Sequence, residues 1–222
     1  MKHISPYLPF DENDYKDFFE KEYTAQLGAI TFDEAKVIFH AFKILPKKLV
    51  RDLVNRIEFD PSLGKSKHVF PNHGRWEDNF GTMILNRSVI DLEPNESLHL
   101  IIHEIGHALD HKLGDMSKTP AWLELSEWTL DPPGITPRQK SDRNYLHHGR
   151  YRRLRIEETG LYSVSEWWYN EDADFVRWYA KRNPQEDFCE SFAYYVIEEM
   201  DRFKGCPLKA EFIKNKVLQN NI

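Results

Sequence analysis

The chain has 222 residues, a formal net charge of −6 and an apolar fraction of 41%, and aromatic residues make up 14% of it. This length fits one large domain or two small ones, and the aromatic residues supply packing surface that disordered chains lack. Two cysteines exclude a disulfide scaffold, the mild acidity disfavours nucleic-acid binding, and no apolar run approaches the roughly 18 residues of a membrane helix. The segment 1–6 has no apolar stretch typical of a signal peptide, so we expect a cytoplasmic protein, with signal-less export left open.

The first fifty residues are predicted to be helical. Aromatic residues at helical spacing among acidic ones favour an amphipathic helix over residues 11–26. Residues 31–34 fit a capping box, so a second helix should begin there and end before Pro46, and a short third helix should cover 47–55. We therefore expect a helical N-terminal cap over residues 1–52, followed by the main domain over residues 53–222.

The period of the apolar pattern then changes. Residues 54–59 alternate between apolar and polar, as a half-buried strand does, and residues 81–86 are a second candidate strand. A strongly apolar helix is expected from about residue 95 to 113, where Gly114 follows. The remainder is predicted to be mainly helical: 120–128, pieces between 137 and 182, and about 185–203. The expected fold class is α+β, with unequal lobes.

The apolar helix carries the motif His103-Glu104-x-x-His107. Histidines four residues apart lie on one face of a helix, and both can bind one Zn²⁺ at about 2.0–2.1 Å. Glu104 stands beside the first ligand, where its carboxylate can take a proton from a metal-bound water as that water attacks a carbonyl. A helix with solvated histidines is the alternative interpretation. The motif predicts a zinc site with His103 and His107 as ligands and Glu104 as the catalytic base.

Catalytic zinc usually needs a third protein ligand. His111 lies about 12 Å along the helix axis from His103, too far to share the metal, and is expected to be solvated or to contact a ligand. A downstream helix that opens at residues 183–184 offers Glu186 and Glu190 on one face, although acidic residues in a first turn are also ordinary partners of the helix dipole. One of the two should bind the metal and the other should orient a ligand histidine.

The two segments, His-Glu-Ile-Gly-His-Ala-Leu-Asp at 103–110 and Glu-Asp-Phe-Cys-Glu-Ser-Phe-Ala at 186–193, resemble the motifs of gluzincin zinc metallopeptidases. The resemblance is closest to the anthrax lethal factor-like group and the Pro-Pro endopeptidases. It implies a zincin-like fold, with a small mixed sheet and the active-site helix in an upper lobe and a mainly helical lower lobe. It also implies that Glu186 is the third zinc ligand and Glu190 its outer partner.

The same resemblance implies roles for two further segments. Tyr179, seven residues before Glu186, would stabilise the oxyanion; an aromatic residue in the core is the alternative. Residues 81–86 would form the edge strand that holds the substrate backbone; an interior strand is the alternative.

The sequence has two further features, a basic segment and a cysteine beside Glu190. Between Arg138 and Arg155, seven Lys and Arg residues stand against one acidic residue. A solvated basic face is the plain interpretation, and an acidic or nucleic-acid-associated partner is the sharper one. Cys189 is expected to be a buried apolar residue rather than a catalytic thiol.

The sequence therefore predicts a zinc-dependent endopeptidase that hydrolyses peptide bonds in a protein or peptide substrate. The alternative is a non-catalytic zincin-like metal-binding module that recognises a protein or a nucleic-acid-associated partner. Glu104 favours the enzyme, because a structural zinc site is closed by four protein ligands and has no use for a carboxylate that activates water.

Overall fold

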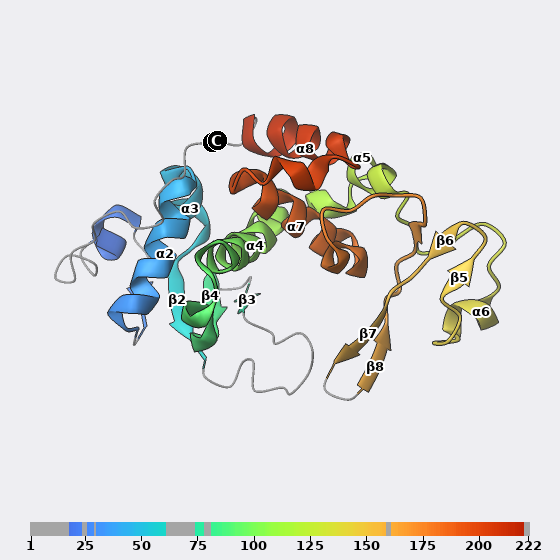
Figure 1. Ribbon diagram of the computed structural model, residues 1–222, viewed down its shortest axis with the longest axis horizontal. Coiled ribbons are helices and arrows are strands. Elements are labelled where there is room, and N and C mark those ends of the chain that lie inside the picture. Colours follow the sequence, from blue (N-terminus) through green and yellow to red (C-terminus); the bar gives the residue numbers. More distant parts are fainter. Residues whose placement is uncertain are drawn as a thin grey trace. The chain divides into compact units, whose positions relative to one another are not determined.

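A computed structural model of the chain describes residues 18–23, 26–28, 30–60, 74–77, 81–158 and 161–219. Their contacts divide them into two compact units, one ending at Lys112 and the other running from Leu113 to residue 219. Both units contain helices and strands (Figure 1), which confirms the α+β class. Among the described helices, none combines the length and the apolar character needed to cross a membrane.

The first unit is built on a four-stranded mixed sheet with the order β1-β2-β4-β3. The strands are Gln26–Leu27 (β1), Arg56–Phe59 (β2), Gly74–Glu77 (β3) and Thr82–Leu85 (β4). β1, β2 and β4 are parallel, whereas β3 pairs antiparallel with β4. All four residues of β4 are buried, as expected for a strand with neighbours on both sides. The expectation that residues 81–86 form the sheet edge is thus wrong: β4 is interior, and β3 is the edge among the described strands.

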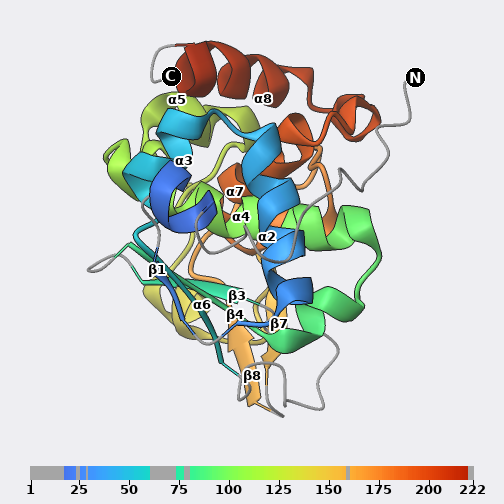
Figure 2. The ribbon, with the colours of Figure 1, turned by 90° about the vertical axis from the view of Figure 1, so that its left-hand side faces the viewer.

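The helices of the first unit follow the sequence signals closely. They are the π-helical turn Phe18–Tyr23 (η1), Phe32–Ile44 (α2), Lys47–Leu53 (α3), the 3₁₀ turn Arg87–Asp91 (η2) and Pro94–Lys112 (α4). The capping box is confirmed, because the Glu34 amide donates to Thr31 Oγ1 at 3.3 Å and the Thr31 amide donates to Glu34 Oε2 at 2.6 Å. Figure 2 shows α2, α3 and α4 beside the strands of this sheet.

The structure tests only part of the two predictions for the N-terminal region. Of the helix predicted over residues 11–26, the structure describes η1 and β1, and residues 11–17 lie outside the described residues. The cap over residues 1–52 and the domain over 53–222 stay predictions; α2 and α3 belong to the same unit as α4.

The second unit contains several short strands where helices were expected. Its helices are Met116–Lys118 (η3), Pro120–Leu123 (α5), Glu124–Ser126 (η4), Pro137–Ser141 (α6), Trp178–Arg182 (η5), Pro184–Val196 (α7), Met200–Phe203 (η6), Pro207–Phe212 (α8) and Ile213–Leu218 (η7). Its strands are His147–His148 (β5), Tyr151–Arg152 (β6), Arg155–Glu158 (β7), Leu161–Val164 (β8) and Tyr169–Asn170 (β9). β5, β6 and β9 form one antiparallel sheet, and β7 and β8 form a hairpin.

The prediction of a mainly helical segment is therefore wrong over residues 147–170. Strands of two to four residues are too short for their alternation to stand out in a window of helical length. Gly149, with φ of 57°, supplies the left-handed conformation in the turn between β5 and β6.

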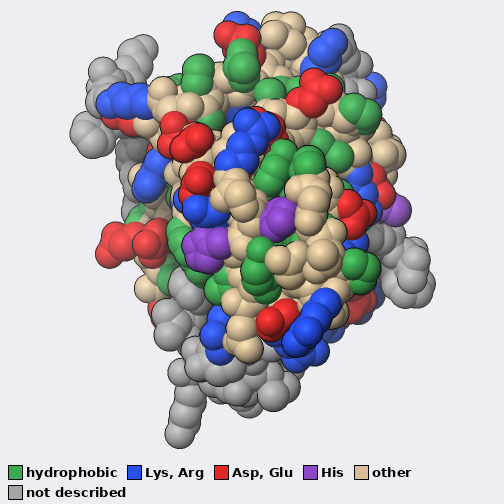
Figure 3. Space-filling model, turned by 90° about the vertical axis from the view of Figure 1, so that its right-hand side faces the viewer, with side chains coloured by type: hydrophobic (Ala, Val, Ile, Leu, Met, Phe, Trp, Pro, Cys, Tyr) green, Lys and Arg blue, Asp and Glu red, His purple; other side chains and the backbone are tan. Residues whose placement is uncertain are grey.

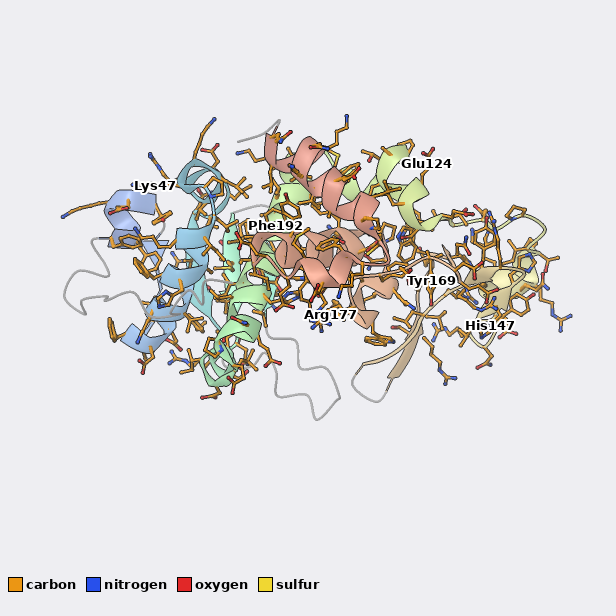
Figure 4. The ribbon with its side chains drawn as sticks, turned by 45° about the horizontal axis from the view of Figure 1, so that its top comes forward. Lys47, Glu124, His147, Tyr169, Arg177 and Phe192 are labelled. Carbon is orange, nitrogen blue, oxygen red and sulfur yellow. The ribbon has the colours of Figure 1, made fainter. Side chains whose placement is uncertain are left out.

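The core of the second unit packs around α7. Phe188 and Phe192 of this helix (Phe192 is labelled in Figure 4) are fully buried, as is Trp122 of α5. The Trp122 ring meets Phe188 edge-on at 5.3 Å, and its Nε1 donates to the Pro184 carbonyl at 3.2 Å. The start of α7 is thus confirmed, but the helix ends at Val196 instead of about residue 203, because Glu198 adopts a positive φ of 62°.

A buried ion pair fixes the first turn of α7 to α8. Lys209 Nζ lies 2.8 Å from Asp187 Oδ1, and both side chains are almost completely buried. Trp128 Nε1 donates to the other carboxylate oxygen at 3.1 Å, and Lys209 also donates to the Asp174 carbonyl at 3.1 Å. Burial raises the pKa of Asp187, and Lys209 and Trp128 oppose that rise. Both charges are satisfied, so the pair sets the position of the residues that follow in α7.

Replacing Lys209 with Met should lower the free energy of unfolding by about 3–5 kcal/mol, because it leaves the Asp187 carboxylate buried without its cation. Urea denaturation measures this change. The matched control is Lys204→Met, which removes the exposed pair with Asp201 and should change stability by less than about 0.5 kcal/mol. Equal effects of the two substitutions would contradict this account of the pair.

Candidate metal centre

Helix α4 carries the three motif residues in an apolar setting. Ile101, Ile102 and Ile105 of this helix are fully buried. His103 and Glu104 lie among them with 7% of their surface exposed, and His107 is half-buried. Polar groups in such surroundings need hydrogen-bond or metal partners.

The two motif histidines face each other across one helical turn. Their Nε2 atoms are 3.2 Å apart, and their rings meet at 79° with centroids 4.9 Å apart. Two nitrogens bound tetrahedrally to one zinc at 2.0–2.1 Å would lie about 3.3 Å from each other. The distance also suits an N–H···N hydrogen bond between a donor and an acceptor tautomer. The spacing of the two nitrogens is therefore compatible with a shared metal ion.

The other histidines of α4 differ in exposure. His111 is exposed, as expected for a residue that does not share the metal. His99, one turn before His103, is buried, and its ring lies 6.2 Å from that of His103 at 34°. Sequence reasoning did not single out His99, although the repeated four-residue spacing of 99, 103 and 107 was a usable signal.

Strand β3 passes very close to Glu104. A Cβ atom placed on Gly74 would lie 2.8 Å from Glu104 Cγ and 2.9 Å from its Oε1. A contact that short does not occur, so a side chain at residue 74 would require the Glu104 side chain to shift. Gly74 was missed in the sequence, because a lone glycine outside any predicted element carries no signal of its neighbour.

In the second unit, Glu186 lies in the first turn of α7 beside Tyr179 and Arg182. Asn183 caps the helix by accepting from the Glu186 amide at 2.9 Å. The Tyr179 hydroxyl lies 3.4 Å from Glu186 Oε1, and Arg182 Nη1 donates to that hydroxyl at 2.8 Å. Arg182 Nη1 is also 3.9 Å from Glu186 Oε1. The phenol group thus faces the carboxylate, and Tyr179 is half-buried rather than a core residue.

Glu190, one turn further along α7, contacts a different cation. Its Oε2 lies 3.4 Å from Nε of Arg177, which is labelled in Figure 4, and its side chain is 3% exposed. Arg177 also flanks the Tyr179 ring, with its guanidinium carbon 5.8 Å from the ring centroid. Cys189 forms no disulfide among the described residues and is fully buried, which confirms the expectation that it is a buried residue.

Three of the seven basic residues of the segment 138–155 form ion pairs within the second unit. Its ion pairs are Lys140 with Asp131, Arg150 with Glu127, and Arg152 with Glu171. Figure 3 accordingly shows blue and red side chains interspersed on one face.

Arg153 of the same segment is buried rather than solvated. It donates to the backbone carbonyls of Lys140, Asp142 and Tyr145, and it lies 4.6 Å from the centre of the Trp168 ring. Its guanidinium group holds this loop region together, so it belongs to the folded interior and not to a basic binding face.

The candidate residues thus form two groups. His103, Glu104 and His107 come together in the first unit, and Tyr179 and Glu186 come together in the second. Comparisons with protein-family models, curated proteins and solved structures found no match to this chain. The function proposed below therefore rests on the chemistry of these two groups of residues.

Zinc titration should show one tight site per chain, and His107→Ala should weaken zinc affinity at least about 100-fold because it removes one imidazole ligand. Competition with a chromogenic chelator measures the affinity. The matched control is His111→Ala, which removes an exposed histidine from the same helix and should leave affinity unchanged within about twofold. Unchanged affinity after His107→Ala would exclude this histidine as a ligand.

Proposed function

We propose that the chain is a zinc-dependent endopeptidase of the gluzincin type, with His103, His107 and Glu186 as zinc ligands. The observation that carries the proposal is the pair of facing Nε2 atoms, 3.2 Å apart, on the helix that also holds the buried Glu104 carboxylate. A donor set of two imidazoles and one carboxylate leaves the fourth zinc position open for water, which is the arrangement of catalytic rather than structural zinc. The fold that goes with this proposal is zincin-like, and peptides are the substrates.

Zinc in such a site would lower the pKa of water to about 7 and polarise the scissile carbonyl. Glu104 would accept the proton of the attacking water while the new C–O bond forms. It would then deliver that proton to the leaving amine as the C–N bond breaks. The close approach of Gly74 supports this role, because it limits the positions that the carboxylate can take.

Tyr179 would donate a hydrogen bond to the oxyanion of the tetrahedral intermediate. Its hydroxyl already accepts a hydrogen bond from Arg182, so its own proton is directed away from the guanidinium. In the described geometry that proton points to Glu186 Oε1 at 3.4 Å. With the carboxylate engaged by metal, the phenol proton becomes available for a substrate oxygen.

The edge strand gives a place for the peptide. Within the described sheet, β3 pairs with β4 on one side only. An extended peptide that pairs with its other side would gain main-chain hydrogen bonds, a common way for proteins to hold unstructured chains. Since Gly74 of β3 lies against Glu104, a peptide on this edge would be held close to the catalytic base.

Glu104→Gln should keep zinc affinity within about threefold and lower kcat about 1,000-fold, because the amide cannot accept the proton of water. Cleavage of a mixed peptide library, followed by mass spectrometry, measures the loss. Glu96→Gln on the same helix is the matched control, because Glu96 is exposed and should leave cleavage unchanged. Full activity of the Glu104 variant would rule out the mechanism.

The choice between the two glutamates of α7 is tested by zinc affinity. Glu186→Ala should lower it at least about 100-fold, whereas Glu190→Gln should lower it about tenfold, as expected for a residue that acts behind a ligand. The pairing of Glu190 with Arg177 supports this order. The reverse order of the two effects would make Glu190 the ligand.

A further inference from the structure

A cavity of about 310 Å³, lined by both polar and apolar residues, opens in the second unit beside the start of α7. Three segments line it: Lys118 at the end of η3, residues 163–167 at and after β8, and residues 182–185. The segment 182–185 includes Arg182, whose guanidinium group also donates to the Tyr179 hydroxyl. Arg182 therefore both lines this cavity and contacts Tyr179, the residue proposed to stabilise the oxyanion.

The charged residues that line the cavity are two cations and one carboxylate. Lys118 and Arg182 face one acidic lining residue, Glu166, whose side chain is exposed. Lys118 pairs with Asp115 at 2.8 Å, but both side chains are solvated, and such surface pairs are weak enough to exchange partners. Arg182 lies 3.9 Å from Glu186, and under the proposed function that carboxylate gives its charge to zinc.

The neutral lining adds hydrogen-bond donors. Ser163 and Ser165 contribute hydroxyl groups, and Gln185 contributes its side-chain amide. The cavity also lies at the N-terminus of a 13-residue helix, where the helix dipole favours a negative group. Two cations, two hydroxyls and a helix terminus make this cavity suited to a carboxylate.

We propose that this cavity is a substrate subsite for an acidic side chain, an Asp or Glu of the peptide, with Lys118 as the residue that selects its charge. The inference rests on the proposed function, because it takes the ligand to be a residue of the peptide substrate. A carboxylate there would accept hydrogen bonds from Arg182 in its forked geometry and from Lys118 as a point charge. The volume of the cavity accommodates one such side chain together with water.

The test uses peptide libraries in which one position at a time is fixed as Asp, Asn or Lys and all others are mixed. Cleavage by the zinc-loaded wild-type protein and binding to the Glu104→Gln variant are measured in parallel. At one position, Asp peptides should be preferred over Asn peptides about tenfold in both assays, because the two side chains differ mainly in charge. Lys118→Glu should abolish this preference and favour Lys at the same position.

The matched control is Lys204→Glu, which reverses the charge of another exposed lysine paired with an aspartate three residues earlier. It should keep the preference for Asp. Equal use of Asp and Asn by the wild-type protein, or an unchanged Asp preference in Lys118→Glu, would overturn the subsite.

The two proposals fail in different ways. Binding of Asp peptides that depends on Lys118, without any cleavage by the wild-type protein, would keep the subsite and reject the peptidase. Cleavage without a preference for Asp would keep the peptidase and reject the subsite. Absence of both cleavage and charge-dependent binding would reject both.

Discussion

The cost of burying polar side chains on α4 shapes the first unit. Two imidazoles and a carboxylate lie on a helix whose isoleucines are fully buried, and such groups are tolerated only where partners offset the loss of water. The facing Nε2 atoms of His103 and His107 meet this need for the two imidazoles, and β3 lies against the Glu104 carboxylate at Gly74. A side chain at residue 74 would displace the Glu104 carboxylate from this position.

The second unit solves a similar problem along α7, where three carboxylates occur within five residues. Like charges at this spacing repel one another unless each has its own counter-charge. Each cation comes from a different element: Lys209 of α8 for Asp187, Arg177 before η5 for Glu190, and Arg182 of η5 for Glu186. The Asp187 pair is the most deeply buried and serves the fold, whereas Glu186 meets its cation at 3.9 Å and has a phenol beside it. This division of partners gives the physical basis for taking Glu186 as the metal ligand.

Local signals in the sequence were sufficient for part of this picture. The capping box at Thr31, the helix around His103 and the Asn183 cap depend on residues within a few positions, and all three are present as predicted. The β3 edge and the strands between 147 and 170 depend on pairing with distant segments, and their runs of two to four residues are too short to read alone. The ion pairs of the basic segment depend on distant residues in the same way, since Glu127, the partner of Arg150, lies 23 residues away. Contacts with distant segments therefore determine which short segments form strands and which basic residues of a surface have an acidic partner.

Zinc and the cavity beside α7 are linked through Arg182 under the proposed function. One guanidinium group contacts the Tyr179 hydroxyl, approaches Glu186 and lines the cavity. Neutralisation of Glu186 by a metal removes the nearest negative charge in this unit from Arg182, which strengthens its attraction for a carboxylate in the cavity and for the phenol oxygen. Metal binding would then raise the affinity for an acidic side chain, and the acidic side chain would raise the affinity for metal by the same factor, because coupling between two binding events is reciprocal. Arg182, which contacts the phenol proposed as catalytic, would in this arrangement also bind the acidic side chain whose charge Lys118 selects.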